Sequence, residues 1–204
     1  MNIIDRVKNI IITPAKEWDV IAQETPDSGK IVTGYVLPLA GLAAVAAFIG
    51  YSFIGMNTGF FRVRGFDWGI YHAVNVFIAA FVSVFVSSFI IDALAPSFKS
   101  EKNMARSVQL VAYSFTPAWL GGFLAILPVI SFIGSLFALY GLYLLYVGLP
   151  KLKKTPEENR VAYFVVSLVV MVGVFLVIGL IMSMLIMPIM GLSNSIDIRS
   201  LRFD

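Results

Sequence analysis

The sequence predicts an all-α, polytopic membrane protein with five transmembrane helices, a tight hairpin between helices three and four, and an interfacial amphipathic N-terminal segment. Of its 204 residues, 59% are hydrophobic and only 13% are charged, whereas soluble domains carry about 25% charged residues. The mean hydropathy is +0.88, and several uncharged stretches are long enough to cross a bilayer. This small number of charged side chains is not enough to cover the apolar surface in water. A lipid bilayer is therefore the expected solvent.

Residues 1–30 are predicted to form a cytoplasmic, interfacial amphipathic segment rather than a span. Apolar residues recur there at helical spacing, at Ile3, Ile4, Val7, Ile10 and Ile11. Thr13 and Pro14 have the residue types of an N-cap and a first helical position, so a second helix is expected. Trp18 on this helix would sit at the headgroup level, which makes Pro14 and Trp18 candidate interfacial anchors. The alternative interpretation is a docking platform for a cytoplasmic protein.

The membrane domain is predicted over residues 31–190, with a short extracytoplasmic tail over 191–204 and spans at about 31–54, 69–92, 107–127, 129–149 and 161–188. The run Ser107–Pro150 decides the number of spans, because its 44 uncharged residues are about twice the length of one span. Division at Pro128 gives two helices of about 21 residues, each about 31 Å long. Both match a hydrocarbon core of about 30 Å.

Lys and Arg are distributed unequally over the predicted loops. The N-terminal segment, the loop after the second span and the loop before the fifth hold 11 of these residues, and the opposite side holds 4. The positive-inside rule therefore predicts a cytoplasmic N-terminus and an extracytoplasmic C-terminus.

Ionisable residues within the spans are candidates for function. Asp92, near the inner end of the second span, is either an edge residue that reaches headgroups or Lys99, or a buried polar anchor between helices. His72 and Asn75, one helical turn apart near the outer end, are expected to form hydrogen bonds at a helix interface, with a pH-sensing or ligand role as the alternative. Asp92 and His72 are about 30 Å apart on one helix and cannot form an acid–base pair.

Pro117 leaves a carbonyl without its helical donor. It cannot donate to the carbonyl of Tyr113, four residues earlier, and an unpaired carbonyl in lipid is costly. We expect a polar partner from Tyr143, Ser114, a protonated Asp92 or a water molecule. The result is either a packed helix kink or a small cavity facing the cytoplasm.

Small residues predict two faces for close helix approach. They are Gly41, Ala44 and Ala47 on the first span, and Gly134, Ala138 and Gly141 on the fourth.

The composition argues against several kinds of site. The chain has no cysteine and one histidine, so neither a thiolate site nor a multi-histidine metal site is possible. No phosphate-binding glycine loop, metalloprotease motif or nucleophile elbow occurs. We therefore expect no cofactor, no metal, no enzymatic activity and no nucleic-acid partner.

Three motifs in order resemble bacterial Yip-domain proteins. They are "ITPAKEWDVIAQE" at 12–24, followed by "GYVLPLAGLAA" with Pro38, "AYSFTPAWLGGFLAILP" at 112–128, and "LYGLYLLYVGLPKL" at 139–152. The resemblance implies a five-helix integral membrane protein of the bacterial cytoplasmic (inner) membrane with a cytoplasmic N-terminus. Eukaryotic relatives are implicated in vesicle traffic and interact with Rab GTPases, but their acidic D-L-Y-G-P-type motif is absent here.

The sequence leaves three kinds of function open. The favoured one is a membrane scaffold, organiser or adaptor that acts through its cytoplasmic N-terminus and helix faces, with the lipid bilayer, a homo-oligomer or a cytoplasmic protein as partner. The alternative is a small transporter or channel with a cytoplasm-facing polar cavity. An intramembrane enzyme acting on lipid would need a nucleophile or metal that the sequence does not supply.

Overall fold

The chain is almost entirely helical, and the computed structural model describes residues 2–57 and 62–189. It divides into two compact units, Met1–Ser167 and Leu168–Asp204. The second unit, within the described range, is the continuation of the last helix, α9 (Glu157–Ile189). The predicted tail over 191–204 lies outside the described residues. The all-α class predicted from the sequence is confirmed.

The first unit begins with two short helices, α1 (Ile3–Ile12) and α2 (Pro14–Gln23). Its remaining elements, in chain order, are α3 (Ser28–Ile31), the π-helical η1 (Val32–Val36), α4 (Leu37–Ile49), the π-helical η2 (Gly50–Ile54), β1 (Met56–Asn57), β2 (Arg62–Val63), α5 (Phe66–Leu94), η3 (Ala95–Phe98), α6 (Met104–Ser114), α7 (Thr116–Gly122), η4 (Phe123–Ile126), η5 (Pro128–Ile130) and α8 (Ser131–Lys153).

Four of the described helices are long and apolar enough to cross a membrane. They cover Ser28–Ile54, Phe66–Phe98, Pro128–Lys153 and Glu157–Val177. The predicted third span, 107–127, is not one continuous helix. It is divided into α6, α7 and the short 3₁₀ turn η4, and only Thr116–Ile126 forms a further, shorter apolar helix. The structure therefore supplies four candidate spans where the sequence predicted five continuous ones.

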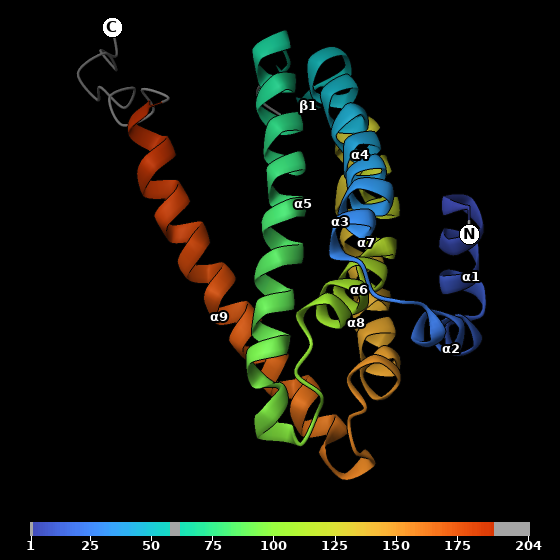
Figure 1. Cartoon of the computed structure of the whole chain (residues 1–204). Helices are drawn as coiled ribbons and strands as arrows, with labels where there is room; N and C mark the ends of the chain where they lie inside the picture. Colours follow the sequence, from blue (N-terminus) through green and yellow to red (C-terminus); the bar gives the residue numbers. More distant parts are fainter. Residues whose placement is uncertain (1, 58–61, 190–204) are drawn as a thin grey trace, which may run out of the picture. The chain divides into compact units, whose positions relative to one another are not determined.

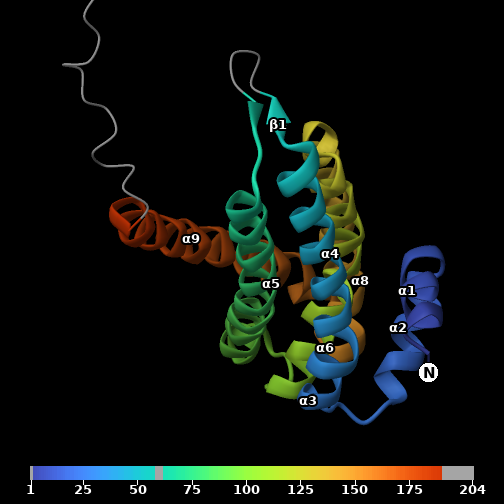
Figure 2. The same ribbon diagram turned by 90° about the horizontal axis from the view of Figure 1, so that it is seen from above.

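Helices α4, α5, α6 and α8 form the framework of the first unit. Helix α5 packs against α4 and α6, and α8 packs against α6 and α7. Helices α1 and α2 lie on the side of α4 away from α5, as Figures 1 and 2 both show. The strands β1 and β2 pair antiparallel, Met56 with Val63, in the connection between α4 and α5.

The core of this unit lies where α2, α6 and α8 meet. Fully buried apolar side chains from these helices include Ile21, Leu110, Val111, Leu144 and Leu145. The opposite face of α8 exposes Phe132, Leu136 and Leu139. An apolar face of this kind is suited to contact with lipid chains rather than with water.

The helix α3–α4 contains a widened turn before Pro38. The proline cannot donate to the carbonyl of Gly34. In the preceding turn, η1, the N–H of Leu37 donates to the carbonyl of Val32, five residues earlier. Such π-helical turns are rare and are frequently found at functional sites. This turn places Tyr35 on the inner side of the helix, where its ring is buried.

Candidate functional site

The break between α6 and α7 is stabilised by a threonine. The hydroxyl of Thr116 donates to the carbonyl of Tyr113 over 2.7 Å. The same hydroxyl is hydrogen-bonded to the hydroxyl of Tyr35, also over 2.7 Å. The chain thus replaces the donor that Pro117 lacks with the side chain of the residue just before it.

The Tyr113 carbonyl therefore has a polar partner, as predicted, but this partner is Thr116 and not one of the expected residues. Tyr143 is about half exposed on α8 and Asp92 is engaged elsewhere. Within the described part of the chain, the buried hydroxyl of Ser114 has no hydrogen-bond partner. The prediction failed because the i−3 hydroxyl bond of a threonine is local, and only candidates from other helices or from position 114 were considered.

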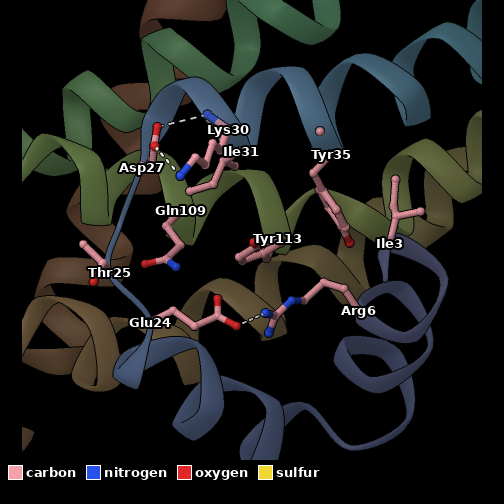
Figure 3. Close-up of a pocket in the computed structure, with 11 residues that line it drawn as sticks. Ile3, Arg6, Glu24, Thr25, Asp27, Lys30, Ile31, Tyr35, Gln109 and Tyr113 are labelled. Carbon is pink, nitrogen blue, oxygen red and sulfur yellow. Dashed lines mark hydrogen bonds and ion pairs between the residues drawn. The ribbon is translucent and has the colours of Figure 1, made fainter. Parts of the chain in front are cut away.

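A polar pocket of about 390 Å³ lies beside this break. Its walls come from α1, from the connection between α2 and α3, from α3 itself, from η1 and from α6. The lining residues are Ile3, Arg6, Glu24, Thr25, Asp27, Lys30, Ile31, Gly34, Tyr35, Gln109 and Tyr113. Figure 3 shows the Arg6–Glu24 pair on one wall and the Asp27–Lys30 pair on the other, with Gln109 and Tyr113 between them. The pocket combines two positive and two negative side chains.

Arg6 is the buried charge that ties α1 to α2. One of its terminal nitrogens donates to Glu17 over 2.6 Å and the other donates to Glu24. Its guanidinium also lies over the ring of Tyr113, at 5.1 Å from the centroid. Arg6 and Glu17 are both almost completely buried, so loss of Arg6 would leave the Glu17 carboxylate uncompensated inside the protein.

Asp27 and Lys30 form the more exposed pair of the pocket. The side chain of Asp27 accepts from the backbone N–H of Lys30 over 3.0 Å, and this bond holds the pKa of Asp27 below its ordinary value. The Lys30 ammonium lies 3.5 Å from the second carboxylate oxygen, with 88% of the side chain exposed. Both groups stand at the beginning of the first candidate span.

The N-terminal helices are docked onto the bundle through side chains of α6 and α8. Arg106 donates from its two terminal nitrogens to the carbonyls of Ile21 and Ala22 at the end of α2, over 3.1 and 2.9 Å. Lys151 pairs with Asp19 over 2.5 Å. The hydroxyl of Tyr140 donates to the carbonyl of Ile11 over 2.8 Å.

The interpretation of Trp18 as a headgroup anchor needs correction. Its side chain is fully buried, edge-on to Tyr113 at 6.4 Å between ring centroids. The site where it packs is open because α8 has a glycine there, Gly148, at which a Cβ would collide with the Trp18 ring. Pro14 does occupy the start of α2, but the hydroxyl of Thr13 donates back to the carbonyl of Asn9 instead of capping this helix.

Asp92 lies between helices rather than among headgroups. Its carboxylate accepts from the ammonium of Lys153 over 2.9 Å, from the hydroxyl of Ser107 over 3.1 Å and from the backbone N–H of Asn103 over 2.8 Å. Lys99, the partner considered from sequence, pairs with Glu158 instead.

Lys153 was not anticipated as a site residue. Its side chain is completely buried and also donates to the hydroxyl of Ser107 over 2.8 Å. The run Lys151–Lys154 gives no signal that Lys153 in particular faces inward, since Lys151 and Lys154 in the same run are exposed.

His72 belongs to an aromatic stack instead of a hydrogen-bonded interface. Its ring stacks on Tyr51 at 3.6 Å between centroids, with Trp68 edge-on at 4.8 Å. The buried Nε2 of His72 has no hydrogen-bond partner among the described residues, and Asn75 is exposed. This group and the pocket are not part of one site, because no element that lines the pocket carries Tyr51, Trp68 or His72.

Taken together, the apolar helices and the buried polar contacts between them define a polytopic all-helical membrane protein. Residues 8–191 match the Yip1 domain, and the chain belongs to the Yip1 domain family. It is similar to the inner membrane protein YohC of Escherichia coli strain K12, with 26% identity over 155 residues that cover 74% of this chain and 80% of the relative. The YohC protein of Escherichia coli O6:H1 matches over the same extent. No solved structure matches the chain.

Proposed function

We propose that this chain is a non-enzymatic scaffold or adaptor of the bacterial cytoplasmic (inner) membrane, acting through helices α1 and α2 and through its helix faces. The observation that carries the proposal is the rigid attachment of α1 and α2 to the membrane helices. Their inner side is fixed by Arg6, Trp18 and the bonds from Arg106. A surface held in one conformation loses less conformational entropy when a partner binds.

The outer side of these two helices offers charged groups to a soluble partner. Asp5, Lys8 and Lys16 are all exposed, whereas the exposed Asp19 pairs with Lys151 of α8. Both signs of charge occur over a short distance, which favours a partner of complementary pattern over a purely acidic or basic one. A cytoplasmic protein is therefore the expected partner, with the lipid bilayer as the medium that surrounds the rest.

We further propose five membrane crossings, with residues 104–126 as a broken third crossing joined by a tight hairpin to α8. Two sets of contacts support this arrangement. The Lys153–Asp92 bond joins α8 to the end of the second span, whereas η5 contacts η2 at the end of the first. The segment that joins these two ends, residues 104–126, must therefore run along the full length of the helices. The positive-inside rule then gives a cytoplasmic N-terminus.

The scaffold proposal is tested by site-specific photo-crosslinking in living cells. A photoreactive residue at Lys16 should give an adduct with one soluble protein. A charge-reversed Lys8→Glu background should weaken this adduct, while the matched position Leu139, 63% exposed on the apolar face of α8, should give none. Adducts with lipid alone at both positions would contradict the proposal. An adduct of two copies through Leu139 would indicate a homo-oligomer instead.

A further inference from the structure

We infer that the pocket between α1, α6 and η1 binds a phosphoethanolamine-type zwitterion, with the ammonium group inside at Glu24 and the phosphate outside at Lys30. The headgroup of phosphatidylethanolamine and a soluble phosphoethanolamine ester share this chemistry. The inference goes beyond the scaffold role, because it assigns a ligand to a site that a scaffold does not require.

The pocket has the size and the walls of a binding site. Its volume of about 390 Å³ lies within the usual range for small-molecule sites, about 300–1,000 Å³. Two of its walls come from irregular backbone, the π-helical turn with Tyr35 and the end of α6 with Tyr113. Irregular backbone within membrane helices is tolerated where it lines a cavity, and both irregularities meet at this one.

The inner end of the pocket carries an excess negative charge. Arg6 is paired with two carboxylates, those of Glu17 and Glu24. The net charge of these three side chains is −1 when all of them are ionised. Glu17 is enclosed, with 5% of its side chain exposed, whereas Glu24 has 37% exposed and lines the pocket. An ammonium group at Glu24 would balance this charge.

The aromatic walls suit the same group. The rings of Tyr35 and Tyr113 lie edge to face, with centroids 4.8 Å apart, and both residues line the pocket. Aromatic faces attract cations, most strongly where water is excluded. The Arg6 guanidinium already lies over the Tyr113 ring, so an added ammonium would rely on the Tyr35 ring. A primary ammonium can also donate hydrogen bonds to the Glu24 carboxylate, whereas a trimethylammonium group cannot.

The outer end of the pocket suits a phosphate. Lys30 is largely exposed and holds Asp27 only in a loose ion pair of 3.5 Å, which is weak in water. It also stands at the beginning of the first candidate span, the level at which lipid phosphates lie.

The inference is tested by native mass spectrometry of the full chain in mild detergent, with phosphatidylethanolamine, phosphatidylcholine and phosphatidylglycerol of identical acyl chains. The wild type should retain phosphatidylethanolamine in preference to the other two lipids. Loss of a charged hydrogen-bond partner should weaken this retention about tenfold or more in Lys30→Gln and in Glu24→Gln. The matched controls Lys99→Gln and Glu158→Gln, an exposed pair on other elements, should leave it unchanged.

A second arm distinguishes the two sources of the ligand. Glycerophosphoethanolamine is added to lipid-stripped protein: competition with the lipid supports a pocket open to the soluble ester, and lipid retention without competition supports a lipid site. Because Glu24→Gln also removes a partner of the buried Arg6, Lys30→Gln is the decisive variant. Equal retention of the three lipids by the wild type, or equal losses in Lys30→Gln and Lys99→Gln, would overturn the inference and leave the scaffold proposal untouched.

Discussion

Lys153 and Lys154 are neighbours in the chain and have opposite environments. The Lys153 side chain is fully buried and bonded to Asp92, whereas the Lys154 side chain is 77% exposed and pairs with Glu101. The bond from Lys154 holds the pKa of Glu101 below its ordinary value. A buried pair is costly to break, because the remaining charge is left without a partner, whereas an exposed pair contributes little.

Replacement of Lys153 by Met should therefore destabilise the protein far more than the same change at Lys154. We expect Lys153→Met to lower the free energy of unfolding by about 3 kcal/mol or more. Lys154→Met should change it by no more than about 1 kcal/mol. Denaturant unfolding in mild detergent, followed by helical circular dichroism, measures both. Equal effects of the two variants would contradict the buried anchor.

Thr116 stabilises the break between α6 and α7 through its side-chain hydroxyl. Its hydroxyl serves both the Tyr113 carbonyl and the Tyr35 hydroxyl. Thr116→Val keeps the shape and removes the hydroxyl, and should cost about 1–2 kcal/mol of unfolding free energy. Thr116→Ser keeps the hydroxyl and should retain most of the stability. If Val and Ser variants unfold alike in the same assay, the hydrogen bonds do not stabilise the break.

At the scale of elements, glycines set the distance between α7 and α8. A Cβ built on Gly134 would collide with the backbone of Gly121, and one on Gly141 would lie 2.7 Å from the carbonyl oxygen of Ser114. Of the small residues predicted to mark close contacts, Gly134 and Gly141 meet neighbouring backbone, and Ala44 and Ala47 are buried on α4. Ala138 is exposed, and a Cβ on Gly41 would have nothing within 4 Å.

The two kinds of glycine should respond differently to alanine. Gly134→Ala forces α7 and α8 apart and should destabilise the protein by about 1–3 kcal/mol. Gly41→Ala fills open space in a helix and should be neutral or stabilising by up to about 1 kcal/mol. Unfolding of the two variants under the same conditions tests this. Destabilisation by Gly41→Ala as large as that by Gly134→Ala would contradict the packing described here.

For the molecule as a whole, the number of crossings has a direct test, since the chain has no native cysteine. Single cysteines at Lys16 and Glu101 should react with a membrane-impermeant maleimide only after the cytoplasmic side is opened. Cysteines at Arg64 and Val129 should react in intact cells. A cysteine at Val129 that is protected until the cytoplasmic side is opened would rule out the third crossing and the hairpin.

Much of the helical framework could be predicted, because it depends on local composition. The uncharged runs predicted helices that the structure has at Ser28–Ile54, Phe66–Phe98, Pro128–Lys153 and Glu157–Val177, and Pro117 predicted the break that separates α6 from α7. The pocket could not be predicted in the same way. Arg6, Glu24 and Gln109 are far apart in the sequence and lie among many other polar residues, and nothing local marks them as neighbours.

The sequence by itself determined that this is an all-helical membrane protein and that its third predicted span is interrupted at Pro117. Hydrophobic length and the missing N–H of proline act over a few residues and leave the chain few choices. Only the tertiary structure decided which residues meet: Trp18 packs against Gly148, Lys153 bonds to Asp92, and Arg6 lies between Glu17 and Glu24. These contacts depend on the rotation and depth of each helix, which are set by packing against its neighbours.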